Sequence, residues 1–418
     1  MNLFLLEAIL LFAFSIPVVM GYRILPVTGT PHWLFGVLFL LLITNIFLAL
    51  KRATGKWQTF IVQAREHIVW FILIIVVGGT TVTAIVDRSQ TAPVFGVHDI
   101  ILQQEAAMRF LLSGKNPYKE TYFGTPLASW HYDESGKTAI NPALYHFVMP
   151  PWYLLFPLPI YAVSIPIVGY FDGRMALLVT LAGLLFVLSK WFKKRPIALL
   201  AITLTALSPA TINYFIEGRS DIFALFWFIW SLYLLEKKQL FWSSVIFGLA
   251  LMSKQTIWFA VPFYLALLWV ERKKDIPSTF LYGGIAAIVS LLVAGPFLLW
   301  DFRAFFDSTV WYLSGNTAHG YPISGYGLGM MLYELHAISD IHAYYPFIIW
   351  QILLGLPIFI ISLKWFLQKP TIWKMIIGYS LSLSVFWYMS RYFNNSHLGF
   401  LSSIFAIGAL KYMDEEPA

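Results

Sequence analysis

Apolar runs recur from one end of this chain to the other, and most are nearly long enough to cross a membrane. A spanning helix needs ~20 apolar residues to cross a hydrocarbon core of ~30 Å. Of the 418 residues, 59% are hydrophobic and only 12% are charged. Within lipid, a helix satisfies all of its backbone hydrogen bonds internally. The sequence therefore predicts an all-α polytopic membrane protein and excludes a soluble enzyme.

The chain has no cysteine, so disulfides, thiolate metal sites and a cysteine nucleophile are excluded. The first apolar stretch, residues 2–20, has no basic region ahead of it and no small-residue cleavage pattern. We therefore interpret it as a retained helix and not as a signal peptide.

The net charge of +7 comes largely from basic residues that gather in a few loops. Short loops rich in Lys and Arg stay in the cytoplasm. We therefore interpret the basic pI as a topology signal and expect no nucleic-acid partner. The clusters are Lys51, Arg52, Lys56 and Arg65; Lys190, Lys193, Lys194 and Arg195; Lys237 and Lys238; Arg272, Lys273 and Lys274; and Lys364, Lys369 and Lys374.

With these clusters inside, the chain has about 12 transmembrane helices and two cytoplasmic termini. Residues 147–170 contain five prolines, which break helices, so we assign them to a broken segment in the outer leaflet. The predicted spans are residues 2–20, 33–50, 67–86, 174–192, 197–215, 221–236, 240–254, 257–271, 279–299, 346–366, 372–390 and 397–411. Two long polar loops, residues 87–142 and 300–345, then lie outside.

This topology places polar residues from five separate loops on the outer side. Ionisable groups near a membrane are costly, and they are usually functional where they converge. The chemistry is therefore expected at this face. The residues are Asp99, Glu105 and Arg109; Glu217, Arg219 and Asp221; Lys254 and Gln255; Arg303; His319; and Arg391, Asn394, Asn395 and His397.

Residues 100–113 are predicted to form an amphipathic helix in the membrane interface. Apolar Ile101 and Met108 alternate with polar residues such as Glu105 and Arg109 at helical spacing. Gly114 and Pro117 end the helix. The helix either forms one lip of an entrance for a lipid head group or only anchors the loop to the surface.

Several short motifs resemble the GT-C superfamily of integral-membrane glycosyltransferases, in particular its polyprenol-phosphate-mannose-dependent mannosyltransferase branch. Each motif alone is weakly specific, and their order carries the resemblance. One departure is Glu217-Gly-Arg-Ser-Asp221 in place of Asp-x-Asp, which weakens the case for a metal there. The motifs are His98-Asp99; Ser-Gly-Lys-Asn-Pro-Tyr over 113–118; Asn141-Pro-Ala-Leu-Tyr; Pro150-Pro-Trp-Tyr; Ser208-Pro209; Glu217–Asp221; Gly-Leu-Ala-Leu-Met-Ser-Lys-Gln over 248–255; and Gly-Pro-Phe-Leu-Leu-Trp-Asp over 295–301.

The resemblance implies a conserved seven-helix module over residues 56–299, whose outer loop 87–173 carries the catalytic acid. Two extra helices in residues 1–55 precede the module, and a large outer loop (300–345) and C-terminal helices (346–418) follow it. The implied activity is inverting transfer of one sugar, with mannose favoured, from a polyprenyl-phosphate donor. By this resemblance we expect membrane lipids around the enzyme and a location in the plasma membrane of a prokaryote. The expected acceptor is a glycolipid, a glycan or a protein at the extracytoplasmic face, and we expect no cofactor and no requirement for a metal, without excluding one.

Asp99 is the predicted general base, because a carboxylate within hydrogen-bond reach can take the proton of an attacking hydroxyl and partial burial can raise its basicity. The alternative is that Asp99 caps the helix over 100–113. Lys254, Arg391 and Arg303 are the predicted cations for the donor phosphate. A lysine at the end of a span can also simply reach for water.

Acceptor or sugar contacts are expected from Glu105, Glu217, Arg219, Asp221 and His319. The alternative for the three residues of the 217–221 turn is that they pair with one another and that Ser220 caps the following helix. His319 lies in a Gly- and Tyr-rich stretch that either closes over the donor or is an ordinary loop.

A multi-pass secondary transporter or flippase of lipid-linked sugars is the competing function, since about twelve crossings also fit that class. Transporters usually have repeated halves with binding sites at mid-membrane. Neither feature is visible in the sequence. A non-catalytic scaffold is a weaker third hypothesis, because it does not explain Asp99 and Lys254 on one face.

Overall fold

The computed structural model describes residues 2–25, 29–51, 53–134, 137–272 and 274–415. Arg52 and Lys273, which belong to the basic clusters, lie outside these residues. The described chain is mostly helical, and its strands are the two-residue pairs β1 (Asp133–Glu134) with β2 (Lys137–Thr138) and β3 (Ser324–Gly325) with β4 (Tyr392–Phe393). The prediction of a predominantly helical protein is confirmed, and the number of about 12 transmembrane helices stays a prediction.

Six helices among the described residues are long and apolar enough to cross a membrane. The other apolar helices are shorter or more polar, which is why they do not meet the same criterion. The six are α1 (Leu3–Gly21); α2 (His32–Leu50); α3 (Gly55–Leu73) continuing through Ile74–Gly79 into α4 (Thr80–Gln90); α8 (Arg174–Trp191); α14 (Ile276–Trp300); and α18 (Ile348–Trp350) continuing through Gln351–Gly355 into α19 (Leu356–Gln368).

The remaining helices fill the rest of the bundle and its loops. The prolines of residues 147–170 divide that stretch into α6 and α7, as the sequence predicts. The remaining helices are α5 (Asp99–Leu112), α6 (Trp152–Leu155), α7 (Leu158–Val168), α9 (Arg195–Leu207), α10 (Ile212–Glu217), α11 (Asp221–Glu236), α12 (Leu240–Leu251), α13 (Val261–Glu271), α15 (Phe302–Phe306), α16 (Tyr312–Ser314), α17 (Leu328–Glu334), α20 (Ile372–Tyr388) and the longer but more polar α21 (Asn395–Glu415).

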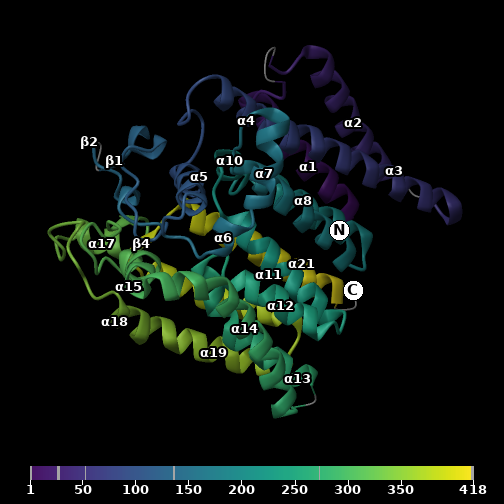
Figure 1. Ribbon diagram of the computed structural model, residues 1–418. Coiled ribbons are helices and arrows are strands. Elements are labelled where there is room, and N and C mark those ends of the chain that lie inside the picture. Colours follow the sequence, from purple (N-terminus) through teal and green to yellow (C-terminus); the bar gives the residue numbers. More distant parts are fainter. Residues whose placement is uncertain (1, 26–28, 52, 135–136, 273, 416–418) are drawn as a thin grey trace.

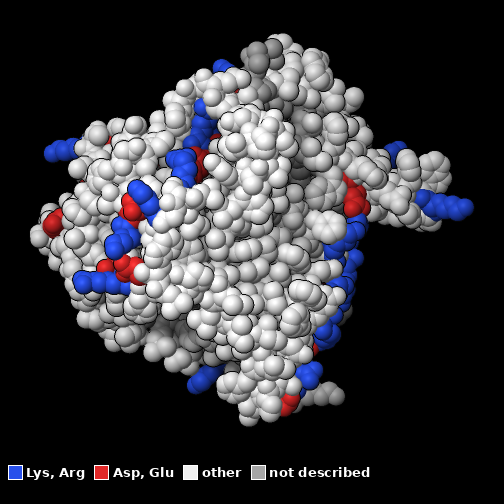
Figure 2. All heavy atoms as spheres, viewed as in Figure 1, with Lys and Arg blue, Asp and Glu red and all other residues white. Residues whose placement is uncertain are grey.

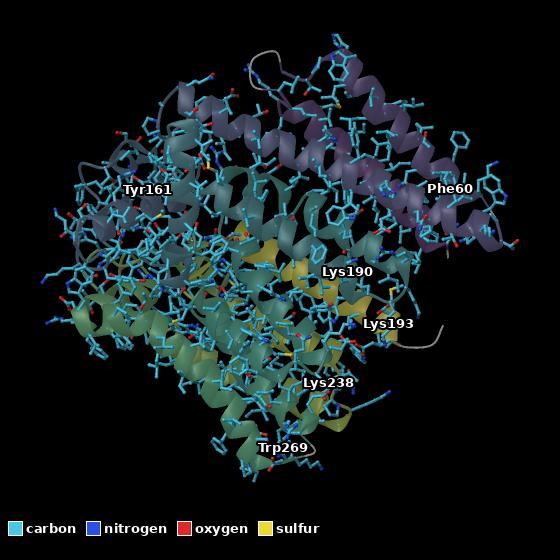
Figure 3. The ribbon with its side chains drawn as sticks, turned by 45° about the vertical axis from the view of Figure 1, so that its right-hand side comes forward. Phe60, Tyr161, Lys190, Lys193, Lys238 and Trp269 are labelled. Atoms are coloured by element: carbon cyan, nitrogen blue, oxygen red, sulfur yellow. The ribbon has the colours of Figure 1, made fainter. Side chains whose placement is uncertain are left out.

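The two ends of the bundle differ in their loops and charges (Figure 1). One end gathers α5, β1, β2, α15 and α17, and the other carries both chain termini. In Figure 2, Lys and Arg form a row along the right-hand edge, whereas acidic and basic side chains mix on the left. Lys190, Lys193 and Lys238 follow one another down the terminal side in Figure 3. The basic loops thus lie away from the loop-rich end.

The third helix begins earlier than predicted, and this corrects the interpretation of Arg65 as a loop cation. Arg65 is 1% exposed inside α3 and forms an ion pair with Glu7 of α1 at 2.5 Å. Its Nε also donates to Asn45 of α2 at 2.9 Å, and Thr203 of α9 donates to Glu7 at 3.3 Å. Polar groups inside a helical bundle must pair with one another, so this cluster ties α1 and α2 to the bundle.

The helix predicted over 100–113 is α5, but its polar face is not solvated. Gln103, Gln104 and Glu105 are buried, and Arg109 is the exposed polar residue on the described helix. Gln103 donates to the carbonyls of Ala143 and His146, at 2.6 and 2.7 Å. The correction has a simple cause: the loop that follows α5 folds back and offers carbonyls to the side chains that the pattern assigns to water.

Candidate active site

The beginning of α5 presents Asp99 as one member of a hydrogen-bonded group. His98 is the N-cap residue, and its backbone N–H donates to the Glu217 carbonyl at 2.8 Å. One carboxylate oxygen of Asp99 lies 2.7 Å from Nδ1 of His98, and the other accepts from Nδ2 of Asn141 at 3.0 Å. Asp99 is the first helical residue and does not cap the helix, so the capping alternative is wrong. Its side chain keeps 18% exposure, which leaves it open to a ligand.

The pKa of Asp99 reflects two opposing influences. Burial raises the pKa, but His98, Asn141 and the charge of Arg219 outweigh burial and hold it at about 2. The expectation that burial makes this carboxylate more basic is therefore wrong in its net direction. Asp99 is ionised at physiological pH and can accept a proton from a hydroxyl that becomes acidic as it attacks an electrophile.

The turn between α10 and α11 packs directly onto α5. Gly218 has φ +99°, and a Cβ there would lie 2.4 Å from the Ile101 side chain, so the turn requires glycine. Arg219 follows, with its guanidinium 4.5 Å from the Tyr214 ring and its Nε 3.8 Å from the Glu217 carboxylate. Nε of Arg219 finds no hydrogen-bond partner within the described ranges. A cation with an unused donor therefore stands in electrostatic reach of Asp99.

Lys254 and Asp221 form the second charged pair. They lie 2.6 Å apart, with 16% and 14% of their side chains exposed. His397 is buried within electrostatic reach of both Lys254 and Arg219. Asp221 therefore pairs with a residue of the turn that follows α12 and not with its neighbours, whereas Glu217 and Arg219 do pair with each other, as the alternative predicts. Ser220 at the N-cap makes no capping bond through its side chain.

Aromatic side chains surround these charges. A cavity of about 470 Å³ is lined by Val94, His98, Trp130, His131, Glu217 and Arg219. The Trp130 ring lies 5.8 Å from that of His98, and its indole N–H donates to the Val97 carbonyl at 2.8 Å. Tyr321 adds a hydroxyl whose pKa is raised by burial and by the charge of Asp99. Rings beside charged groups suit a sugar, which has apolar faces and polar edges.

Glu105 lies in a buried ionic cluster behind the site. Arg88 donates to both of its carboxylate oxygens, at 2.7 and 2.8 Å, and to Asp172 at 2.7 Å. Arg174 holds Asp172 from the other side, at 3.0 and 2.8 Å. Arg174 also donates to the carbonyls of Gly96, Ala84 and Ile216. The cluster joins α4, α5, α8 and α10 and thereby fixes the segments that carry Asp99 and Glu217.

The structure does not bring Arg391, Arg303 or His319 to this group. Arg391 is 2% exposed and donates to the carbonyls of Tyr321, Ala343 and Ile341. Arg303 is 92% exposed beside Asp307. His319 has φ +59° and stacks on Tyr145 with ring centroids 3.8 Å apart. Arg391 instead holds together the loop that carries Tyr321.

Two residues at the site, His98 and Asn141, had no assigned role in the sequence, whereas Trp130 and Tyr321 were among the aromatic residues that could stack on a sugar. His98 and Asn141 stand inside motifs that carry the resemblance, so their position was a usable signal. Within the described residues, no three His, Asp or Glu side chains are grouped as ligands of one metal ion would be.

Helices of membrane-spanning length and a polar, charge-paired cleft at one end of the bundle define a multi-pass membrane protein with an enzyme-like site. The model of glycosyltransferase family 87 matches residues 147–390, which is more than half of the chain. The chain belongs to glycosyltransferase family 87, a family of GT-C-type membrane glycosyltransferases.

The family match confirms the resemblance to GT-C enzymes. It includes the 217–221 turn and Lys254, and it begins after Asp99 and Asn141. Comparison with curated proteins found no match, and neither did comparison with solved structures.

Proposed function

We propose that this glycosyltransferase moves one sugar from a polyprenyl-phosphate donor to a hydroxyl of an acceptor at the extracytoplasmic face. One observation supports this above the others. Segments far apart in the chain bring a carboxylate (Asp99) and two cations (Arg219 and Lys254) to the same region, through shared electrostatic contacts with Tyr321 and His397. A glycosyl phosphate needs this combination, because a proton must leave the acceptor while negative charge develops on the phosphate.

The proposed mechanism is a single displacement with inversion. The acceptor oxygen forms a bond to the anomeric carbon while the bond from that carbon to the phosphate oxygen breaks. The acceptor proton passes to the Asp99 carboxylate, and polyprenyl phosphate leaves with the bonding electron pair. His98 and Asn141 hold the carboxylate in place, at 2.7 and 3.0 Å.

Arg219 and Lys254 are the proposed phosphate ligands. Arg219 has a free Nε donor among the described contacts. Lys254 already pairs with Asp221, which orients the ammonium group, so a bound phosphate would share this ammonium with the Asp221 carboxylate. Arg303 and Arg391 have less claim to this role, since one is exposed and the other donates to three carbonyls. Trp130 and Tyr321 supply surfaces for the sugar.

The topology extends this proposal. We place twelve crossings in the chain, with both termini cytoplasmic and α5 at the outer boundary of a prokaryotic plasma membrane. The two helices of residues 1–55 precede a module over 56–299, followed by an outer loop (300–345) and the C-terminal helices (346–418). The separation between the basic edge and the loop-rich end supports this orientation (Figure 2). Mannose is favoured as the sugar by the resemblance.

The test uses purified protein in nanodiscs with a panel of polyprenyl-phosphate sugars. Release of free polyprenyl phosphate, together with a glycosylated product from an added envelope extract, is the expected result. No release from any donor, with ion-gradient-dependent uptake of sugar into proteoliposomes, would favour the transporter instead.

A further inference from the structure

A second cavity, of about 730 Å³, lies where the extra N-terminal helices meet the bundle. It is formed by the end of α1, the outer end of α4 and the end of α10. Its polar lining comes mainly from Tyr22, Arg23, Thr83, Asp87, Gln90 and Glu217. Most of these residues precede the part of the chain that matches the glycosyltransferase family. Gly96 and Glu217 line both this cavity and the one beside His98, so the two are neighbours.

The cavity wall contains a polar group that lacks a partner. Thr83 is 2% exposed, and its Oγ1 makes no hydrogen bond within the described residues. A buried hydroxyl without a partner costs about 1–3 kcal/mol, so a ligand gains affinity when the Thr83 side chain rotates about χ1 and turns its hydroxyl to the cavity. Thr80 and Thr81 of the same helix differ, because each donates to a carbonyl one turn back.

Further groups around the cavity are open to a ligand. The side chains of Arg23, Asp87 and Gln90 make no hydrogen bond or ion pair with the described part of the chain. Together they offer a cation, a carboxylate and an amide around one space. Tyr22 and Phe95 add rings, and the Tyr22 hydroxyl donates to Asn213 at 3.2 Å. Mixed donors and acceptors with aromatic faces suit a polyhydroxylated ligand better than a lipid tail.

The N-terminal helices are held firmly enough to form a binding wall. Glu7, Asn45 and Arg65 join α1, α2 and α3 through buried contacts of 2.5–3.4 Å. Thr203 extends the cluster to α9. At the other end of α1, the hydrogen bond from the Tyr22 hydroxyl to Asn213 at 3.2 Å holds this end beside α10.

We propose that this cavity binds the saccharide part of the acceptor, and that the N-terminal helices exist in this chain to complete that site. The inference rests on the proposed function, because an acceptor must lie beside Asp99. Glu217 stands at the junction between the two cavities, where the acceptor hydroxyl would pass towards the carboxylate. The saccharide belongs to a glycolipid or to a free glycan, which share this chemistry.

Photoaffinity labelling of the full-length protein in nanodiscs, without donor, tests the proposal. The probe is octyl mannoside with a diazirine on its sugar ring, and labelled peptides are mapped by mass spectrometry. We expect labelling of residues 80–95 that falls about fivefold in Thr83→Val, because one hydrogen bond is worth ~1 kcal/mol. Gln90→Leu, at an exposed position, should lower labelling similarly, whereas Thr81→Val is the matched control and should not.

Equal labelling of Thr83→Val, Gln90→Leu and Thr81→Val would overturn the proposal. Competition against the probe distinguishes a free glycan from a glycolipid as the acceptor. Unlabelled methyl mannoside competes as well as octyl mannoside if the site binds a free glycan, whereas only octyl mannoside competes if the site binds a glycolipid. Donor cleavage is measured separately. If polyprenyl phosphate is released but the three variants are labelled equally, the acceptor cavity alone is refuted. If labelling falls in Thr83→Val and Gln90→Leu but no donor releases polyprenyl phosphate, the proposed function alone is refuted.

Discussion

Replacing Glu105 by Ala tests whether this carboxylate maintains the fold or contacts the substrate. The substitution removes the acceptor of two hydrogen bonds from Arg88 and of one from the Gly173 N–H at 3.1 Å. Arg88, which is 7% exposed, then keeps Asp172 as its remaining ionic partner among the described residues. Removing one member of a buried ion pair costs about 3–5 kcal/mol. That is a large share of the 5–15 kcal/mol typical of a folded domain.

The assay is the free energy of unfolding in detergent, measured by steric trapping. Glu105→Gln should lose less, about 1–3 kcal/mol, because an amide oxygen still accepts one bond. Arg109→Ala is the matched control on the exposed face of α5, with a change within about 0.5 kcal/mol. Folded Glu105→Gln should retain sugar transfer. The reasoning is refuted if Glu105→Ala is as stable as Arg109→Ala while transfer is lost, since that result assigns Glu105 to the substrate.

Three further substitutions test the site. Lys254→Met should lower kcat/KM for the donor about 10- to 100-fold, because it removes a charge-assisted bond to phosphate. The exposed control Arg303→Met should leave kcat/KM unchanged, and equal effects of the two substitutions would contradict the assignment. His98→Phe removes the main group that lowers the pKa of Asp99 against the effect of burial, so this pKa should rise from about 2. The acid limb of the pH profile of kcat/KM should then move to higher pH, and superimposable profiles of the variant and the unmodified protein would refute this. Arg391→Lys cannot reproduce three bonds to carbonyls, so limited proteolysis within residues 315–343 should accelerate, and unchanged cleavage would count against its structural role.

The sequence predicted the elements of the fold better than their partners. Apolar runs and prolines predicted the helical bundle and the break between α6 and α7. Charge bias predicted that Asp99, Arg219 and Lys254 share one side, and their electrostatic contacts agree with this. Both kinds of signal are local, or sum over a single loop, and can be read from one sequence.

The buried ion pairs were not predictable in this way. Arg65 pairs with a residue 58 positions away, and Arg88 pairs with one 84 positions away. Helical periodicity identifies a polar residue but not the partner that removes it from water. Arg65 and Glu105 were therefore assigned to solvent or substrate, although tertiary contacts bury both. The group of His98 and Asn141 around Asp99 likewise depends on a loop closing over 42 positions.

The most direct test of the account is the rate of sugar transfer by Asp99→Asn, with Asp133→Asn as the control. Asp133 lies in the loop that follows α5, pairs with His131 at 2.9 Å and is 55% exposed. With folding verified for both variants, we predict that Asp99→Asn loses transfer by about 10²–10⁴-fold, the usual contribution of a general base, while Asp133→Asn is unchanged. Transfer by Asp99→Asn at a rate near that of Asp133→Asn would contradict the account.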